Sequence, residues 1–252
     1  MTSTTAPGSA QREPELAGQT VVVIGGSSGM GLETARRARA EAAEVILVGR
    51  NPDRLKQAAS ELGAQRTAAF DATDFGQLET FFQGLPTPID HVFVTGPGPY
   101  YAPLAELDRE RAHENFDAHL WLAVAVAQQA VGKVRPGGTL LFMSGTAGGR
   151  GPGLSISAAV TAALPALIAN LAVEVAPIRV NLIAAGFVDT PLSATLLGDD
   201  LRARRDHLRA TLPIGRVVGP ADVAALAVHI MTNTALTGAT YDIDGGQQLV
   251  SS

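Results

Sequence analysis

The chain has 252 residues, of which 46% are hydrophobic and 17% charged, with a net charge of −5. This much apolar material predicts a sizeable core and excludes a chain that is disordered throughout. The absence of cysteine excludes disulfides, thiolate catalysis and cysteine-ligated metals, and five histidines without a close-spaced pair predict no metal site. The acidic balance argues against a nucleic-acid partner.

Two segments bear on the location of the protein. Residues 1–16 are polar and rich in Pro, Ser and Thr, so we predict a flexible tail, a domain over residues 17–252 and a cytoplasmic location. The segment Gly151 to Val173 carries no charge and is long enough to span a bilayer. Its polar residues and prolines favour instead a helix buried in the core or in a subunit interface, so we expect no membrane partner.

Short apolar runs alternate with helix-length segments along the domain. In chain order, the runs 20–24, 45–48, 66–70, 91–95, 138–144, 178–183 and 240–243 predict strands. Helices are predicted at 31–43, 52–62, 75–83, 109–131 and about 155–175, with two further helical pieces before the last strand. This alternation predicts a single doubly wound Rossmann α/β domain, with a parallel seven-stranded sheet and helices on both faces. Ligands should bind at the carboxyl ends of the strands, where the strand order reverses.

A glycine-rich loop separates the first predicted strand from the first helix. Gly25 can adopt a turn that a Cβ would strain, Gly29 lets the backbone approach a pyrophosphate, and Gly31 permits close packing of helix on strand. The N-terminus of the helix then offers free N–H groups and its positive dipole end to phosphates. The loop therefore predicts a dinucleotide site formed by Gly25, Ser27, Ser28, Gly29, Met30 and Gly31.

The spacing G-x-x-x-G-x-G of this loop resembles the short-chain dehydrogenase/reductase family. The resemblance covers about residues 17–250 and includes Asp71-Ala72, Arg179-Val180-Asn181, Gly186-Phe187-Val188-Asp189-Thr190 and Asp242-Ile243-Asp244-Gly245-Gly246. It implies hydride transfer between a nicotinamide cofactor and a carbonyl or alcohol. It also implies that Asp71, next to Ala72, bonds the adenine amino group, and that Val188 and Thr190 hold the nicotinamide carboxamide. Asp71 and Thr190 could instead be loop caps.

The end of the second predicted strand bears on the choice of dinucleotide. An NAD-selective site usually places an acidic residue there to bond the ribose 2′-hydroxyl. Here the strand is followed by Arg50 and Asn51, and the Arg50 guanidinium offers donors that suit a 2′-phosphate. We predict a preference for NADP(H) over NAD(H), with Arg50 and Asn51 in the site. Alternatively, Arg50 is only a solvated loop residue.

The catalytic pattern of the resembled family is broken. That family carries a Tyr and, four residues later, a Lys whose charge lowers the pKa of the phenol. Aligning the helix on Leu171–Ala176 places Ser157 at the Tyr position and Thr161 at the Lys position. Serine has no ionisation near neutral pH and threonine supplies no positive charge. Pro165 should bend or open the helix near the Thr161 carbonyl, either for a ligand or only as a packing kink.

Other residues become candidates for the missing chemistry. The family's Asn-Asn-Ala-Gly stretch is replaced by residues 95–98, in which Gly96 stays a cofactor-binding candidate. Either Tyr100 or Tyr101, just after this stretch, could donate a proton, or both could only line the pocket. His119 stands where the family has a relay Asn, and could instead be structural. The family's Ser falls at Ser144, or at Gly145 in a second alignment. The catalytic candidates are therefore Tyr100, Tyr101, His119, Ser144, Ser157 and Thr161.

Three functions follow from a site with this composition. The first is an NADP(H)-dependent oxidoreductase that acts on a small-molecule carbonyl or alcohol with a non-standard proton donor. The alternatives are an inactive nucleotide-binding pseudoenzyme or partner subunit, and a non-redox lyase or isomerase on the same scaffold. Residues 191–212 should form a variable lid, apolar early and Arg-rich later. The resemblance also implies a homo-oligomer, a dimer or tetramer, that pairs through the long fourth helix and the uncharged helix.

Overall fold

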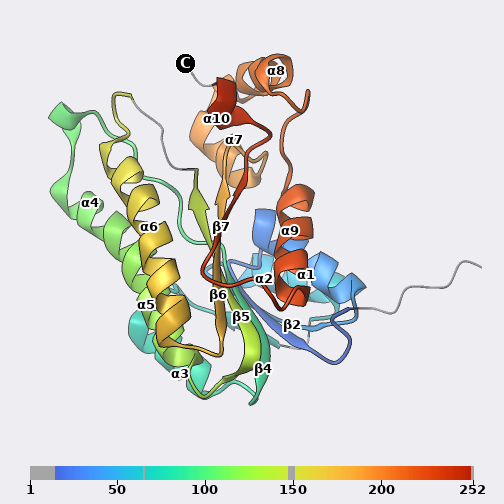
Figure 1. Cartoon of the computed structure of the whole chain (residues 1–252). Coiled ribbons are helices and arrows are strands. Elements are labelled where there is room, and N and C mark those ends of the chain that lie inside the picture. The colour runs from blue at the N-terminus through green and yellow to red at the C-terminus, as the bar shows by residue number, and fades with distance from the viewer. Residues whose placement is uncertain (1–14, 65, 147–150, 251–252) are drawn as a thin grey trace, which may run out of the picture.

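Seven parallel strands form the central sheet, in the order β3-β2-β1-β4-β5-β6-β7 (Figure 1). They belong to a computed structural model that describes residues 15–64, 66–146 and 151–250. The doubly wound Rossmann architecture is thereby confirmed. The strands are β1 (Thr20–Ile24), β2 (Glu44–Gly49), β3 (Arg66–Ala69), β4 (Ile89–Val94), β5 (Val134–Gly145), β6 (Arg179–Ala185) and β7 (Thr240–Ile243).

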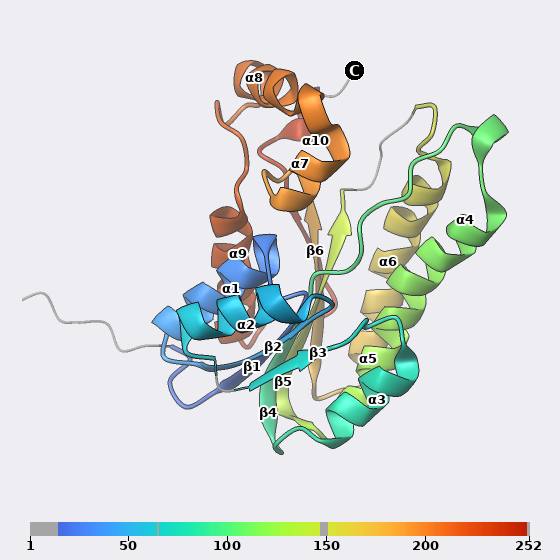
Figure 2. The same cartoon turned by 180° about the vertical axis from the view of Figure 1, so that it is seen from behind.

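Helices cover both faces of this sheet (Figures 1 and 2). One face carries α3 (Phe75–Gln83), α4 (Arg109–Phe116), η2 (Asp117–Trp121), α5 (Leu122–Ala130) and α6 (Ser155–Glu174), and the other carries α1 (Gly29–Ala40), α2 (Pro52–Leu62) and α9 (Pro220–Thr232). Along β1, Val22 points into the first apolar layer and Val23 into the second. Strands with apolar residues on both faces are typical of parallel sheets that are covered on both sides.

Shorter elements lie outside these two layers. The segment between β6 and α9, where the sequence predicts a lid over 191–212, folds into α7 (Pro191–Leu197), η3 (Gly198–Asp200) and α8 (Leu201–Thr211). Figure 1 places α7, α8 and α10 beyond the carboxyl end of β7. The remaining elements are η1 (Leu104–Glu106), after β4, and α10 (Gln247–Val250), after β7.

The domain begins earlier than the sequence predicts. Leu16, which we assigned to the tail of residues 1–16, is fully buried in the same apolar layer as Val21. Its backbone N–H donates to the Glu41 carbonyl at 3.1 Å. The predicted boundary at residue 17 is therefore wrong, because Leu16 gains burial that a tail residue would not have. Residues 1–14 of the predicted tail lie outside the described part of the chain.

The long helix before β5 contains a π-helical turn. The sequence predicts one helix over residues 109–131, and the chain forms α4, the π turn η2 over Asp117–Trp121, and then α5. His119 falls inside this turn. A π turn inserts an extra residue into the helical register and often marks a functional site.

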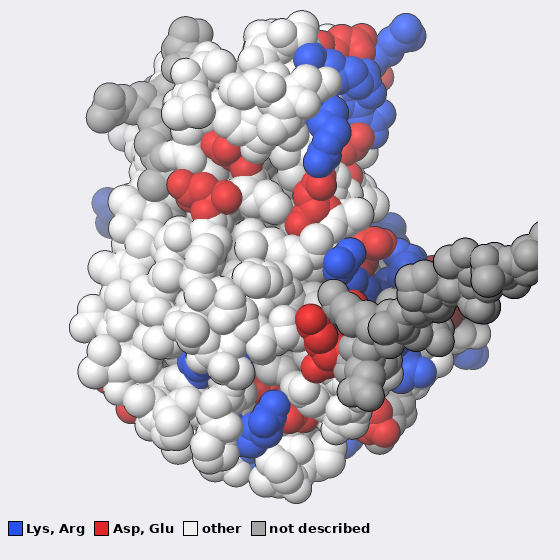
Figure 3. Space-filling view, turned by 45° about the vertical axis from the view of Figure 1, so that its right-hand side comes forward, with Lys and Arg blue, Asp and Glu red and all other residues white. Residues whose placement is uncertain are grey.

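Helix α6 is buried on one face only. Its core side is formed by Val160, Leu164, Ile168 and Leu171. Its length and composition would allow it to cross a membrane, but only 28% of its most apolar 18-residue window is buried. Figure 3 shows few charged side chains on this side of the molecule. The single chain therefore buries only one face of this helix, which leaves the predicted subunit interface as the place where the other face would be covered, and the helix continues unbroken through Pro165.

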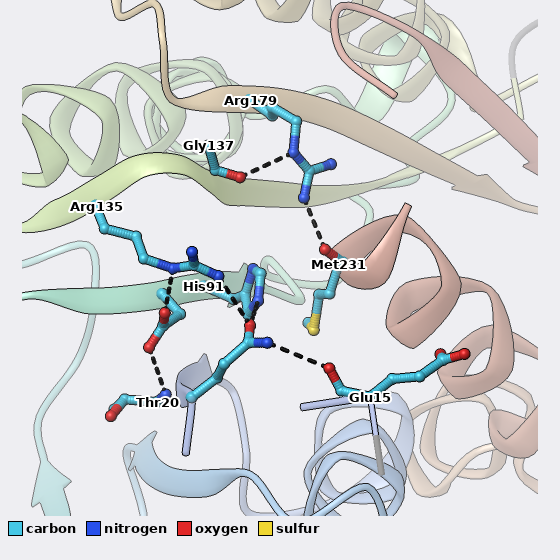
Figure 4. Close-up of polar contacts among 9 residues, drawn as sticks. Glu15, Thr20, His91, Arg135, Gly137, Arg179 and Met231 are labelled. Atoms are coloured by element: carbon cyan, nitrogen blue, oxygen red, sulfur yellow. Dashed lines mark hydrogen bonds and ion pairs between the residues drawn. The ribbon is translucent and has the colours of Figure 1, made fainter. Parts of the chain in front are cut away.

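Buried polar groups hold together the opposite, amino-terminal ends of the strands (Figure 4). Arg179 donates to five backbone carbonyls, among them that of Met231 at 2.7 Å. His91 Nε2 lies 2.7 Å from Gln19 Oε1. Burial, together with the positive charges of Arg179 and Arg135, lowers the pKa of His91 to about 3. His91 is therefore neutral in the folded protein at any pH well above that value.

This buried histidine predicts acid-sensitive stability. Since His91 takes up a proton near pH 6.5 only when the chain unfolds, the stabilisation is present above pH 6.5 and is lost as the pH falls towards 3. Between pH 7 and pH 5 the loss should be about 2 kcal/mol. Urea unfolding at the two pH values should show this loss in the wild type and a smaller one in His91→Gln. An equal pH dependence in both proteins would contradict this prediction.

Candidate functional site

The candidate site lies where the strand order reverses. Strand β1 pairs with β2 on one side and with β4 on the other, so the loops after β1 and β4 leave the sheet side by side. Above these strand ends, Figure 2 shows α7 on one side and α4 with α6 on the other. Crevices at such a switch point are the usual ligand sites of open α/β sheets.

Two glycines of the first loop permit contacts that no side chain could. Gly25 has a φ of +88°, and a Cβ there would lie 2.0 Å from Thr95 Oγ1. A Cβ on Gly31 would lie 2.2 Å from the Gly25 carbonyl oxygen. Gly29 has a φ of +55°, but its nearest contact is Thr190 at 3.7 Å, so the space around it is open. The predicted turn at Gly25 and the predicted close packing at Gly31 are present, and the open space around Gly29 leaves room for the pyrophosphate that the sequence predicts there.

The N-terminus of α1 faces outward from this loop. Ser28 is the N-cap residue, and its side chain makes no capping hydrogen bond. Among the described residues, the first N–H groups of the helix have no side-chain acceptor, so they suit a phosphate. Ser27 Oγ lies 3.0 Å from the position of a Cβ on Gly49, at the end of β2. Met30 packs against the apolar layer below. This cradle fits the pyrophosphate of a dinucleotide.

Arg50 is held loosely beside the cradle. Its side chain is 78% exposed, and Nη1 lies 3.9 Å from Asp71 Oδ2. The other Asp71 oxygen accepts hydrogen bonds from the Thr73 N–H at 3.0 Å and the Thr73 hydroxyl at 2.8 Å. Asn51 accepts a bond from the Arg54 N–H at 2.9 Å and so caps α2. Arg50 can therefore bind a phosphate with little rearrangement, whereas the Asn51 side chain is already used to cap α2.

The remaining cofactor candidates are mostly tied into the backbone around the site. Ala72 packs against the core, and Val188 is buried. Thr190 forms a capping box with Ser193 at the start of α7. The contacts of Thr190 in this structure are therefore those of a helix cap, the alternative that the sequence leaves open. Gly96 has a φ of +71° and lines a small cavity of about 10 Å³.

The two neighbouring tyrosines have different surroundings. Tyr100 is buried, and its hydroxyl accepts a hydrogen bond from the Asp108 N–H at 3.0 Å. The Arg111 guanidinium carbon lies 4.9 Å from the centre of the Tyr100 ring. Through these contacts the Tyr100 side chain packs inside the protein, whereas Tyr101 is 55% exposed. Of the two phenols, Tyr101 is the one left accessible to a substrate.

Tyr101 meets Ser157, the residue that stands at the family's Tyr position. The Ser157 hydroxyl, in the first turn of α6, lies close enough to the Tyr101 phenol to lower the pKa of that phenol. Burial raises the pKa of Tyr101 above its ordinary value, and the Ser157 hydrogen bond lowers it by less. The chain thus brings a phenol close to Ser157 from a loop rather than from α6.

The other catalytic candidates differ in whether their side chains have a hydrogen-bond partner. Thr161 Oγ1 donates to the Ala158 carbonyl at 3.1 Å within α6. His119 Nδ1 lies 2.7 Å from the Asn115 carbonyl, and burial lowers the pKa of His119 although the nearby carbonyls of Asn115 and Pro97 raise it. Ser144 Oγ, at the end of β5, is buried and has no partner among the described residues. A buried hydroxyl without a partner suits a substrate contact, because burial of a hydroxyl without a hydrogen bond is costly.

Sequence reasoning missed Asn115. Its side-chain amide donates to the Gly98 carbonyl at 3.2 Å, while its Oδ1 is buried without a partner among the described residues. It also missed the ion pair between Asp189 and Arg205, which ties α8 to the segment after β6 at 2.7 Å. Asn115 and Arg205 belong to no spacing motif, so only the folded chain reveals these contacts.

Comparison with known proteins agrees with this arrangement. A family model described as enoyl-(acyl carrier protein) reductase matches residues 24–248. The short-chain dehydrogenase/reductase malC of Malbranchea aurantiaca is 28% identical over 255 residues, which cover 93% of this chain and 96% of that protein. The NADP-dependent (R)-specific alcohol dehydrogenase of Lentilactobacillus kefiri is 26% identical over 250 residues, with 92% and 97% coverage.

Solved structures are similar over the same length. The MalC reductase/Diels-Alderase of Malbranchea aurantiaca has a TM-score of 0.87 at 27% identity, and the match covers 94% of this chain and 99% of that one. A small-chain dehydrogenase in complex with NADPH has a TM-score of 0.78 at 27% identity, with 92% and 99% coverage. The chain therefore belongs to the short-chain dehydrogenase/reductase family of oxidoreductases, as the glycine loop and its companion motifs indicate.

Proposed function

We propose that the protein is an NADP(H)-dependent reductase that acts on the carbonyl group of an apolar small molecule. The proton donor in this proposal is Tyr101, assisted by Ser157. The observation that carries it is the contact between these two hydroxyls at the family's Tyr position. A phenol and a neighbouring hydroxyl form a proton-donating pair that Ser157 alone would not supply.

The cofactor half of the site supports this proposal. The uncapped N-terminus of α1 would hold the pyrophosphate, and Arg50 the 2′-phosphate that distinguishes NADPH. The bound cofactor would supply the hydride. Of the similar proteins, one is named an NADP-dependent alcohol dehydrogenase and another was solved in complex with NADPH. Both favour this dinucleotide for the present chain.

The catalytic half of the site suits proton donation. Ser144 Oγ would donate a hydrogen bond to the substrate oxygen, which orients and polarises the carbonyl. The Tyr101 O–H would give its proton to that oxygen as negative charge develops, and the Ser157 hydroxyl would donate to the phenolate that remains. Because Thr161 supplies no cation, the pKa of Tyr101 stays raised. The phenol is then protonated at neutral pH, which favours reduction over alcohol oxidation.

The rim of the site indicates an apolar substrate. Leu192 and Leu196 on α7 are 47% and 52% exposed. Leu192 lies 3.6 Å from the position of a Cβ on Gly98, so α7 approaches the loop that carries Tyr101. The accessible face of Tyr101 adds a further apolar surface. A substrate that covers these side chains would be held mainly by burial of its own apolar groups.

A non-redox reaction is the second candidate. Its support is the lack of a cation at Thr161, together with the likeness to a protein that is named both a reductase and a Diels-Alderase. An inactive nucleotide-binding role has only the missing pair in its favour. Hydride transfer from NADPH separates the proposed reductase from both alternatives.

We also propose that the protein is a homo-oligomer that pairs through α6. The outer face of α6 is uncharged from Ala159 to Val173 and apolar apart from Asn170, and Val173 is 78% exposed. Burial of this face against a second copy would remove it from water.

Replacement of Arg50 should weaken NADPH binding selectively. Loss of a charge-assisted bond to a phosphate corresponds to about a 10- to 100-fold increase in Kd. In a fluorescence titration, Arg50→Ala should show this change for NADPH and less than about a threefold change for NADH. Arg54→Ala, on the exposed side of the adjacent α2, is the matched control. An equal effect on both cofactors would rule out the phosphate contact.

Removal of the Tyr101 hydroxyl should abolish most of the reduction. With NADPH and a panel of apolar ketones, Tyr101→Phe should lower kcat about 100-fold and leave the Kd of NADPH unchanged. Tyr241→Phe, on β7, is the control and should keep full activity. Ser157→Ala should shift the loss of activity at high pH to still higher pH, because Ser157 lowers the pKa of Tyr101. Full activity in Tyr101→Phe would show that another group donates the proton.

A charge on the outer face of α6 should dissociate the oligomer. Sedimentation equilibrium at micromolar concentration should give a dimer or tetramer for the wild type and a monomer for Ala166→Glu. Ala166 is exposed in the single chain, so a monomer can accept the substitution. Ser60→Glu, on the exposed side of α2, should leave the assembly unchanged. A monomeric wild type would exclude this assembly.

A further inference from the structure

We propose that Tyr100 and Asn115 are positioning residues that hold the Tyr101 phenol at Ser157. This inference rests on the proposed function, because it assumes that Tyr101 gives the proton. It concerns the loop between β4 and η1, which contains neither helix nor strand from residue 95 to residue 103.

A loop of this kind does not by itself fix a side chain. Tyr101 is 55% exposed, so the core does not determine its position. A proton donor must stay within hydrogen-bond reach of the reacting oxygen, and small displacements reduce its contribution strongly. The backbone around Tyr101 therefore has to be fixed by contacts with its neighbours.

The first contact is made by the preceding residue. Tyr100 points the other way, into the protein, where its hydroxyl accepts the Asp108 N–H at 3.0 Å. Asp108 is the N-cap of α4 and accepts the Arg111 N–H at 3.1 Å. The Arg111 guanidinium also lies over the Tyr100 ring, at 4.9 Å from its centre. Tyr100 thus joins the loop to the first turn of α4.

The second contact comes from the end of the same helix. Asn115 is more than nine-tenths buried, and its side-chain N–H donates to the Gly98 carbonyl at 3.2 Å. Its Oδ1 has no partner among the described residues, although burial of a polar atom without a partner is unfavourable. An apolar side chain at position 115 would avoid this cost. We therefore infer that the asparagine serves to donate the hydrogen bond to the Gly98 carbonyl. The Asn115 carbonyl also faces His119, which links the contact to the π turn.

The third contact follows Tyr101 and reaches the other helix. The Ala102 N–H donates to the Gly153 carbonyl at 3.1 Å, just before α6 begins. Residues 100 and 102 are thereby joined to α4 and to the segment that enters α6, respectively. Tyr101 lies between these two attachments, and its phenol reaches Ser157 on α6. The contacts of Tyr100 and Asn115 thus determine where that phenol lies.

A double-mutant cycle tests this inference. Tyr100→Phe keeps the ring but loses the acceptor for Asp108, and Asn115→Leu loses the bond to Gly98. With NADPH and apolar ketones, each should lower kcat about 10-fold and leave the Kd of NADPH and the melting temperature nearly unchanged. In the Tyr101→Phe background, neither should lower kcat further, because both act through the Tyr101 hydroxyl. Arg109→Ala, on an exposed position of α4, is the control and should be silent in both backgrounds.

The outcomes separate this inference from the function on which it rests. Equal losses in the wild-type and Tyr101→Phe backgrounds would overturn it, because Tyr100 and Asn115 would then act on the whole fold. Full activity of both variants would overturn it as well. If Asn115→Leu does not fold, Asn115→Ala takes its place in the cycle. Full activity of Tyr101→Phe itself would overturn the proposed proton donor, and this inference with it.

Discussion

The close approach of Gly31 to the Gly25 carbonyl is the constraint on which the site depends. A Cβ on Gly31 would lie 2.2 Å from that oxygen, so α1 can begin this close to β1 only with glycine there. The approach brings the uncapped N-terminus of α1 to the edge of the sheet, beside the loop that follows β4. Thr95 occupies the space that a side chain on Gly25 would need, which couples the two loops. The dinucleotide cradle and the segment that carries Tyr101 are therefore built on one packing contact.

A threonine at position 161, where we predict the family's lysine position to fall, changes what a phenol in the proposed site can do. In the resembled pattern a cation lowers the pKa of the phenol, so that it works as acid or base. Here burial raises the pKa of Tyr101, and the Ser157 hydroxyl offsets only part of that effect. A phenol with a raised pKa keeps its proton at neutral pH. Without a cation at position 161, the Tyr101 side chain is therefore a poor base but remains available as an acid. Reduction of a carbonyl requires such an acid.

The sequence predicted the sheet and the cradle because both depend on local patterns. Alternating apolar runs determine the strand and helix order, and Gly25, Gly29 and Gly31 have conformations or contacts that suit only glycine. The buried face of helix α6 was harder to predict from the sequence. Its residues are uncharged on all sides, so the pattern does not show which face lies against the sheet and which remains exposed. The contacts of Tyr101 with Ser157 and of Asn115 with Gly98 join residues far apart in the chain. No spacing pattern encodes such pairs, so the sequence offered Tyr100 and Tyr101 as equals and did not single out Asn115.

The two halves of the site are fixed by different kinds of interaction, and this difference explains how one half can depart from the family while the other does not. The cradle is made of backbone groups whose positions follow from the sheet and from α1, so a substitution at Gly25 or Gly31 would disturb the core itself. The proposed proton donor is a side chain on a loop, which is attached by hydrogen bonds from Asp108 and Asn115 and by one from the Ala102 N–H to the Gly153 carbonyl. Such a loop can be rebuilt without repacking the sheet.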